Sequence, residues 1–385
     1  MAVYISYWIA SLLFGITFRG RLATHFFMVV TFIFIGLRLE TGFDWPVYKD
    51  IYLAFIEDFS VLNVLIYSAV YGQEPGFLLL LGLSASYMPG YEFFQAVVTL
   101  VFLFSITSIG NFFKIKRLIL LVAIILSFML WSVGFSTLRQ SLAISFFNFG
   151  FIFFLQKRRF ATWAFFLISM SFQLSSFLYI GSLLLSKYLT VKKRRPSFLT
   201  FSVFGVGTFI LLQVLVDLAS WISPLAARKL EYYLATGISY QLDIFDFIFL
   251  TFFVAAGILA SHRQSENQDI VPNVVELRKL IVVMAGIGAC SILIPVVRDR
   301  ISYELFILIS VYLMTQNLTR MWTYIVFFVT FGIASSAMTF LILPARTAFV
   351  PYQNVVSSYV FDIPSTGRDR SGQFMDDYLQ SLEQR

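Results

Sequence analysis

The chain has 385 residues, of which 59% are hydrophobic, 18% aromatic and 13% charged. About a quarter of the residues of a soluble globular protein are charged, so the composition excludes that class and indicates a membrane protein. The net charge of +7 does not indicate a nucleic-acid partner, because the basic residues stand in short clusters between apolar runs, as they do in proteins oriented by a membrane.

Many apolar runs reach the roughly 20 residues that an α-helix needs to cross a bilayer, and none alternates as a membrane β-strand does. The predicted fold is therefore all-α, a polytopic transmembrane helix bundle of about 11 to 13 spans. We expect one catalytic bundle over residues 1–361 and a polar C-terminal tail over residues 362–385. Met1–Phe18 lacks a basic start and a small-residue cleavage site, so it is predicted to be a retained first span.

Basic clusters predict the cytoplasmic side of the membrane. They lie at residues 19–21, 114–117, 157–159 and 187–195. The segment 38–74, which holds six acidic and two basic residues, is then predicted on the outer side. Two stretches do not fit simple alternation across the membrane. Pro75–Met88 is predicted to be re-entrant or in-plane before a span at Glu92–Phe113, and Phe160–Ser186 is predicted to form two short helices that meet near Phe172-Gln173.

In the middle of the chain, Ile119–Trp131 is predicted to exit and Ser141–Leu155 to return, with Arg139 in the external loop Gly134–Gln140 between them. Further spans are predicted at Phe198–Ile222, Phe245–Ala260, Leu280–Val297, Leu305–Leu318 and Met321–Leu343. Polar segments predicted on the outer side by these spans contain Arg228, Arg298 to Arg300, Arg346 and Tyr352.

Arginines on the outer face form the first part of the predicted site. Arginine presents a planar fork of donors that matches phosphate oxygens in a bidentate way, and at the edge of a membrane span it needs a partner. We predict that Arg139, together with Arg298 or Arg300, holds a pyrophosphate. The alternative is that these arginines are interfacial anchors, or that they pair with nearby carboxylates to pack helices.

Asp44 and Glu74 are the candidates for a general base, because the predicted outer face has carboxylates but no histidine. Each could also be an ordinary solvated loop acid. A further group of outer aromatic residues could stack on sugar rings, although a belt of interfacial aromatics explains them as well. These are Trp45, Tyr48, Tyr52, Tyr232 and Tyr233.

No cofactor or metal site is predicted. The single cysteine, Cys290, lies in an apolar run, and the chain has no zinc-ligand spacing, phosphate-binding glycine loop or dinucleotide turn. Asp243 and Asp246 stand three residues apart at the start of a predicted span, where carboxylates that cap a helix N-terminus are more common than a metal site.

Several motifs resemble, in order and spacing, the Wzy/EpsG-type polymerases of bacterial O-antigen and exopolysaccharide. They are Arg38 with Gly42-Phe43-Asp44 and Tyr48, Glu74-Pro75-Gly76-Phe77, Leu138-Arg139-Gln140-Ser141-Leu142-Ala143, Phe172-Gln173-Leu174-Ser175-Ser176, Arg298 to Tyr303, and Pro351-Tyr352. The resemblance implies a GT-C-like bundle in the bacterial inner (cytoplasmic) membrane. It further implies an enzyme that joins repeat units carried on undecaprenyl pyrophosphate at the periplasmic or outer face.

The residues and the resemblance together predict Asp44, Glu74 and Arg139 as catalytic residues. The predicted substrate-binding residues are Arg38, Gln140, Gln173, Arg228, Arg298, Arg300 and Tyr352. Relatives often have Phe-His where this chain has Phe172-Gln173. Because glutamine can orient a hydroxyl but cannot take its proton, the role of base falls to the carboxylates.

The expected partners are the undecaprenyl-pyrophosphate-linked oligosaccharide, membrane lipid and, as a candidate, a chain-length regulator. Two other functions compete with the polymerase hypothesis. An O-antigen ligase would use the same donor, whereas a flippase or transporter would leave the glycosidic bond intact. Transporters commonly contain internal repeats, and this chain shows no repeat of convincing period.

Overall fold

The computed structural model describes residues 2–190, 244–261, 272–292, 294–316, 318–341, 349, 352–361, 366, 367 and 369. These residues form helices and no strand; one isolated β-bridge joins Arg38 to Asn354. Residues 198–222, Arg228, Arg346 and most of the predicted tail lie outside the described residues, so the predictions made for them stay predictions.

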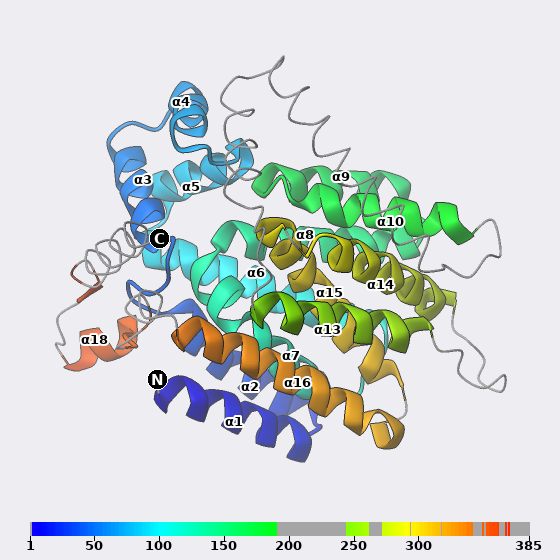
Figure 1. Cartoon of the computed structure of the whole chain (residues 1–385). Helices are drawn as coiled ribbons and strands as arrows, with labels where there is room; N and C mark the ends of the chain where they lie inside the picture. The colour runs from blue at the N-terminus through cyan, green and yellow to red at the C-terminus, as the bar shows by residue number, and fades with distance from the viewer. Residues whose placement is uncertain are drawn as a thin grey trace.

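Helices account for nearly all of the described chain (Figure 1). They are α1 (Ala2–Thr17), α2 (Arg21–Gly36), α3 (Trp45–Glu57), α4 (Val61–Tyr71), α5 (Pro75–Tyr87), α6 (Tyr91–Phe112), α7 (Leu118–Met129), the π-helix η1 (Leu130–Ser136), α8 (Leu138–Leu155), α9 (Arg159–Phe172), α10 (Ser176–Thr190), α13 (Ile244–Ser261), α14 (Pro272–Cys290), α15 (Pro295–Thr315), α16 (Leu318–Leu341) and α18 (Val355–Phe361). The prediction of an all-α fold is confirmed for this part of the chain.

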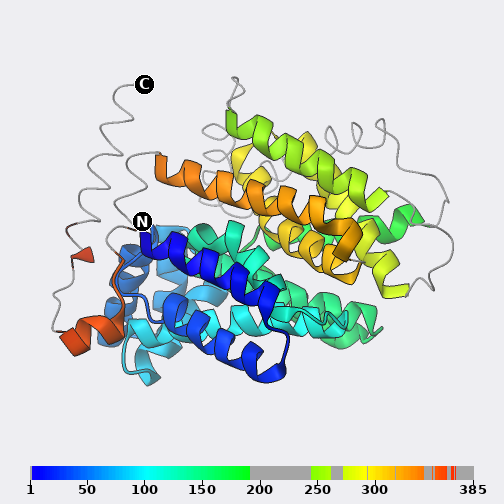
Figure 2. The same ribbon diagram turned by 90° about the horizontal axis from the view of Figure 1, so that it is seen from below.

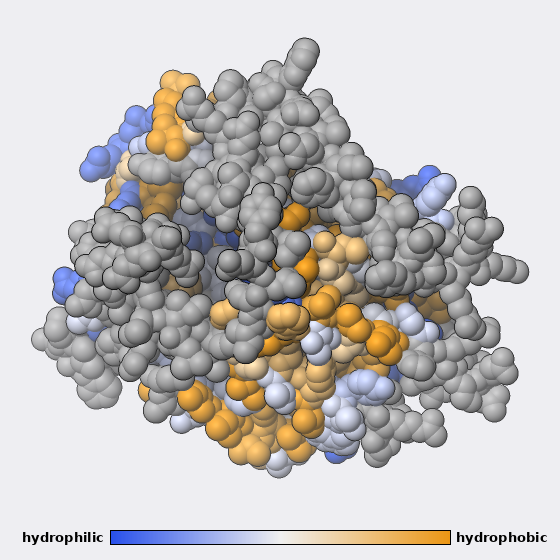
Figure 3. All heavy atoms as spheres, in the orientation of Figure 1, coloured by the Kyte–Doolittle hydropathy of each residue, from blue (hydrophilic) through white to orange (hydrophobic). Residues whose placement is uncertain are grey.

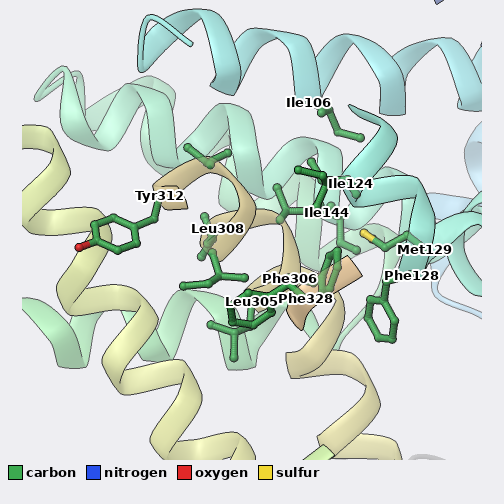
Figure 4. Packing of buried hydrophobic residues seen from close by; sticks show 14 of the residues in the cluster. Ile106, Ile124, Phe128, Met129, Ile144, Leu305, Phe306, Leu308, Tyr312 and Phe328 are labelled. Carbon is green, nitrogen blue, oxygen red and sulfur yellow. The ribbon is translucent and has the colours of Figure 1, made fainter. Parts of the chain in front are cut away.

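Helix α7 lies at the centre of the bundle, and every residue from Ile119 to Met129 is buried. A helix that is apolar all round must be covered all round. Helices α1 and α6 cover it on one side and α15 and α16 on the other, and Figure 2 shows these N-terminal and C-terminal helices as opposite sides of the bundle. In the close view, Phe128 at the end of α7 lies near Phe306 and Phe328 (Figure 4).

The outer surface of the bundle is apolar as well. Exposed apolar side chains gather over the region of α1 and α16 in Figure 3, and Leu13, Phe26 and Phe104 are among the exposed residues. Burying such side chains against hydrocarbon is favourable, so this surface fits a lipid environment. Among the described residues, α6 and α8 are long and apolar enough to cross a membrane by length and composition. The predicted span count stays a prediction.

Several predicted elements agree with the structure. The span at Glu92–Phe113 is α6, and the span at Phe245–Ala260 is α13. Phe160–Ser186 forms two helices, α9 and α10, which meet at Gln173 as predicted. Pro75–Met88 is a helix, α5, whose position relative to a bilayer stays a prediction.

Two predicted loops are helical in the structure. The stretch Gly134–Gln140 was expected to be a loop, but η1 runs to Ser136 and α8 begins at Leu138, so that only Thr137 lies between them. A span was expected at Leu280–Val297, followed by a loop at Arg298 to Arg300. In the structure α14 ends earlier, at Cys290, and α15 begins at Pro295, so that Arg298 to Arg300 are helical. Proline fits the first turn of a helix but cannot continue one, which explains why Arg298 to Arg300 lie in the first turns of α15 and not in a loop.

Candidate functional site

Arg139, the second residue of α8, is held by two partners. Its Nε donates to the hydroxyl of Tyr48 at 2.9 Å, and its Nη1 donates to Oε2 of Glu74 at 2.5 Å in an ion pair. The side chains of Arg139 and Glu74 are 15% and 13% exposed, so the pair is largely withdrawn from solvent but still reachable. Among the described residues, Nη2 of Arg139 makes no hydrogen bond. The guanidinium is thus fixed in position with donors left over.

The segment that carries Asp44 is tied to η1. Gly42 has a φ of +113°, and a Cβ there would lie 2.2 Å from the carbonyl oxygen of Phe135, so only glycine fits both the conformation and the space. The Nε of Arg38 donates to that same carbonyl at 3.1 Å, and the backbone N–H of Phe43 donates to Oγ of Ser136 at 3.2 Å. These contacts fix the position of the next residue, Asp44.

Tyr48 connects Asp44 to Arg139. Its hydroxyl donates to Oδ2 of Asp44 at 2.9 Å while it accepts from Arg139. Asp44 precedes α3 and Tyr48 lies one turn into it, which is the spacing at which residues share one face of a helix. Among the described residues, Oδ1 of Asp44 accepts no hydrogen bond, so it is available to another donor.

Glu74 is placed by a close contact between two helices. It precedes Pro75, the first residue of α5, and a Cβ on Gly76 would lie 2.3 Å from Oγ of Ser171 in α9. This approach brings Oε1 of Glu74 within 3.3 Å of the backbone N–H of Leu174, just after α9 ends. Both carboxylate oxygens of Glu74 therefore accept hydrogen bonds, one from Leu174 and one from Arg139.

A second group of contacts joins Arg300 to the same end of α8. Nη1 of Arg300 donates to Oε1 of Gln140 at 3.0 Å, and Nε2 of Gln140 donates to the hydroxyl of Tyr179 at 2.6 Å. Tyr179 in turn donates to the backbone carbonyl of Arg300 at 2.8 Å. Because Gln140 follows Arg139 in the chain, the two arginines belong to neighbouring parts of one polar network.

Arg298 has a different environment. It forms ion pairs with Asp246 and Asp299 and lies over the ring of Phe249, 4.6 Å from its centroid, and only 8% of the residue is exposed. Both carboxylates neutralise its charge, so its described contacts are those of a helix-packing ion pair. Asp246 serves this pair, and the described residues contain no group of three or more His, Cys, Asp or Glu that could hold a metal ion.

Three further predicted binding residues have structural contacts. Arg38 is 1% exposed and donates to the carbonyls of Phe135 and Ile35. Tyr352 donates to the carbonyl of Phe34 at 2.7 Å and stacks on its ring. Gln173 ends α9, is 9% exposed, and its side chain makes no hydrogen bond to the described residues. A role of these residues in binding stays a prediction.

The aromatic residues of α3 that were predicted to stack on sugar rings are buried in the structure. Trp45, Tyr48 and Tyr52 are each less than 5% exposed and belong to the apolar core around α5. They follow one another at helical spacing along α3, which packs all three rings toward α5 and leaves no ring face open for a sugar to stack on. Tyr232 and Tyr233 lie outside the described residues.

Three helices begin at residues of this arrangement. Helix α3 begins directly after Asp44, α5 directly after Glu74, and α8 one residue before Arg139. The positive ends of helix dipoles favour anions, and two arginines add formal charge. The arrangement therefore favours an anion.

The described residues form a helical bundle with exposed apolar side chains and a largely buried group of arginines and carboxylates, which fits a membrane protein. The model of the EpsG family matches residues 21–354, which is most of the chain. The chain therefore belongs to the EpsG family, as its motifs suggested, and this membership indicates a membrane-bound polysaccharide polymerase of the glycosyltransferase kind. No curated protein and no solved structure matches it.

Proposed function

We propose that this protein joins oligosaccharide repeat units carried on undecaprenyl pyrophosphate at the outer face of the bacterial inner membrane. The observation that carries the proposal is the arrangement around Arg139: a guanidinium fixed by Glu74 and Tyr48, with donors left over, next to a carboxylate that has an open oxygen. In this proposal the enzyme needs no metal or cofactor, and the membrane supplies the lipid-linked donor.

Arg139 binds the pyrophosphate of the donor. Its remaining N–H groups match phosphate oxygens, and hydrogen bonds between ionised groups are about twice as strong as neutral ones. As the glycosidic bond breaks, negative charge grows on the pyrophosphate, and a donor fixed in advance stabilises that charge without reorganising. Glu74 provides this preorganisation, because both of its oxygens are already occupied and it holds the guanidinium in one orientation.

Asp44 is the proposed general base. Its Oδ1 is open among the described residues, whereas both oxygens of Glu74 accept hydrogen bonds. The acceptor sugar hydroxyl attacks C1 of the donor sugar, its proton passes to Asp44, and the bond from C1 to the pyrophosphate oxygen breaks. The electron pair of that bond leaves with the lipid pyrophosphate. A single displacement of this kind inverts the configuration at C1.

Arg300 is the proposed second phosphate ligand. In the described chain its guanidinium bonds a neutral partner, Gln140, whereas the charge of Arg298 is neutralised by two carboxylates. The sequence left open which of the two assists Arg139, and the contacts favour Arg300. Gln173, which follows α9, is proposed to orient the acceptor hydroxyl through its side-chain amide, which bonds no described residue.

The experiment is a polymerisation assay with purified protein and undecaprenyl-pyrophosphate repeat units in detergent. A ladder of products with increasing numbers of units is expected. A single transfer that occurs only when a lipid A core acceptor is added would identify a ligase instead. Donor that crosses a vesicle membrane with its glycosidic bond intact would identify a flippase.

Arg139→Lys is the sharpest variant for this assay. Lysine keeps the charge but loses the planar fork, so the rate should fall about 100- to 1,000-fold, as when one charge-stabilising donor is removed from an active site. Arg19→Lys is the matched control, because Arg19 is exposed and outside the network. Equal chain lengths from the Arg139→Lys variant and the control, at equal protein amounts, would show that the site is elsewhere.

A further inference from the structure

Helix α4 presents an apolar face that no described residue covers. The side chains of Val61, Leu62, Leu65, Ile66 and Val70 are exposed, from 44% for Ile66 to 69% for Val70. These positions repeat at helical spacing, so they form one continuous face of the helix. Helix α4 has no charged residue in its 11 positions.

Asn63, Tyr67 and Ser68 of α4 are turned inward or hydrogen-bonded near its ends. Val64 is buried, and the ring of Tyr67 lies 5.1 Å from that of Phe55. Ser68 donates to the carbonyl of Gln73, and Asn63 donates to Asp58. A helix on a water-exposed surface has the opposite arrangement, with polar residues outward. The pattern of α4 is therefore that of a helix whose outer face meets an apolar phase.

The length of α4 limits how it can lie. Eleven residues of α-helix extend about 16 Å, which is roughly half of the hydrocarbon core of a bilayer. Polar residues flank both ends: Glu57 and Asp58 are exposed before it, and Gln73 and Glu74 follow it. A helix this short with polar residues at both ends cannot have one end on each side of the membrane.

Exposed apolar side chains are also present on the helices that α4 and α5 pack against. Helix α4 packs on α5, and α5 packs on α6 and α9. Exposed apolar side chains are present on each of these helices, including Leu79 on α5, Leu100 on α6 and Leu167 on α9. Helix α6 is long enough to cross a membrane, so the surface that reaches α4 begins on a candidate span. Figure 1 shows α4 at the outer edge of the group formed by α3, α4 and α5.

We propose that α4 is an interfacial helix whose face Val61, Leu62, Leu65, Ile66 and Val70 is buried in the hydrocarbon of the lipid bilayer at the edge of the site. The segment 38–74 is then in part a membrane-embedded element, although its charge pattern predicted an external loop. Glu74 lies three residues after α4 ends, so the bilayer fixes the height of the Arg139 and Glu74 pair relative to the membrane surface. This inference does not depend on the reaction that the site performs.

Site-directed spin labelling tests the proposal on the full chain in phosphatidylglycerol and phosphatidylethanolamine nanodiscs. Single cysteines at Leu62, Leu65 and Asp58 are introduced in a Cys290→Ser background and labelled with a nitroxide. Collision rates with oxygen, which concentrates in hydrocarbon, and with a water-soluble nickel chelate are then measured. Labels at Leu62 and Leu65 are expected to meet oxygen at least several times more often than nickel, and the label at Asp58 is expected to show the reverse.

Three outcomes would overturn the proposal. A label at Leu65 as open to nickel as the one at Asp58 would place the face in water. Low collision rates with both reagents would show that protein covers it, either a second copy or another subunit. A shift to low rates only when lipid-linked donor is added would assign the face to the tail of the substrate. If labelled variants are not monodisperse, Leu65→Trp with fluorescence quenching by brominated lipids gives the same answer, since strong quenching supports the proposal and its absence refutes it.

Discussion

Tyr48→Phe removes one oxygen atom from the centre of the candidate site. The hydroxyl accepts from Arg139 at 2.9 Å and donates to Asp44 at 2.9 Å, and the residue is 1% exposed, so phenylalanine fills the same space. Each lost hydrogen bond to a charged group is worth about 1.5–3 kcal/mol, of which water at the partly exposed Arg139 and Asp44 recovers a share. We therefore expect a loss of stability of about 1–3 kcal/mol.

The larger effect is expected on the rate. Without the hydroxyl, neither the proposed phosphate ligand nor the proposed base keeps its orientation, and the turnover number should fall about 10- to 100-fold, which corresponds to about 1.4–2.8 kcal/mol. Tyr52→Phe is the matched control. Tyr52 lies one turn further along α3 and is equally buried, and within the described chain its hydroxyl donates only to the carbonyls of Ser84 and Met88 at 3.3 Å. Initial rates in the polymerisation assay and thermal unfolding would be measured for both, and equal losses of rate would refute a special role for Tyr48.

Three other predictions use the same assays. Gly42→Ala should destabilise the protein by at least about 1–3 kcal/mol in thermal unfolding, because Gly42 has a positive φ and lies against a carbonyl oxygen. Gly181→Ala is the control and should not destabilise the protein, because a Cβ at Gly181 would meet nothing within 4 Å. Asp44→Asn should lower turnover at least about 100-fold with donor binding retained, and a normal rate would remove Asp44 as base. Arg298→Met should cost about 3–5 kcal/mol of stability because it removes the cation that forms a buried ion pair with Asp246. Arg300→Met should chiefly raise the KM for donor about 10-fold, and interchanged effects would contradict the assignment.

The sequence was sufficient for those parts of the fold that depend on composition and period. An apolar run followed by a polar segment predicts a helix end to within a few residues, as for α6. The basic clusters at both ends of Phe160–Ser186 predicted two short helices there, which are α9 and α10. The helical nature of Gly134–Ser136 could not be predicted in this way. A π-helix and a loop can have the same composition, and the choice between them depends on contacts with Arg38 and Gly42 that are distant in sequence.

The candidate site shows the same limit. Charge and motif order selected Arg139, Glu74 and Asp44, which the structure brings together. They did not select Tyr48 as the residue that joins two of them, because an aromatic residue near a membrane surface is usually an interfacial anchor. The spacing of four residues between Asp44 and Tyr48 could have indicated their contact. It does so only when α3 is known to begin at Trp45, because only a helix brings residues at that spacing together. Similarly, the residues that pair with an arginine could not be predicted, because they depend on which helices pack together.

The proposed mechanism gives each charge in the site a role. Glu74 balances Arg139, so the pair alone has no net charge with which to attract a doubly charged pyrophosphate, and in the proposal Arg300 supplies that charge. The negative charge of Asp44 would disfavour donor binding, and the hydrogen bonds from Arg139 to Tyr48 and from Tyr48 to Asp44 link that carboxylate to a cation. In the proposed step Asp44 takes the proton of the acceptor hydroxyl, so its own negative charge would disappear as negative charge grows on the leaving pyrophosphate. The proposed proton transfer would therefore offset part of the charge that develops during the reaction.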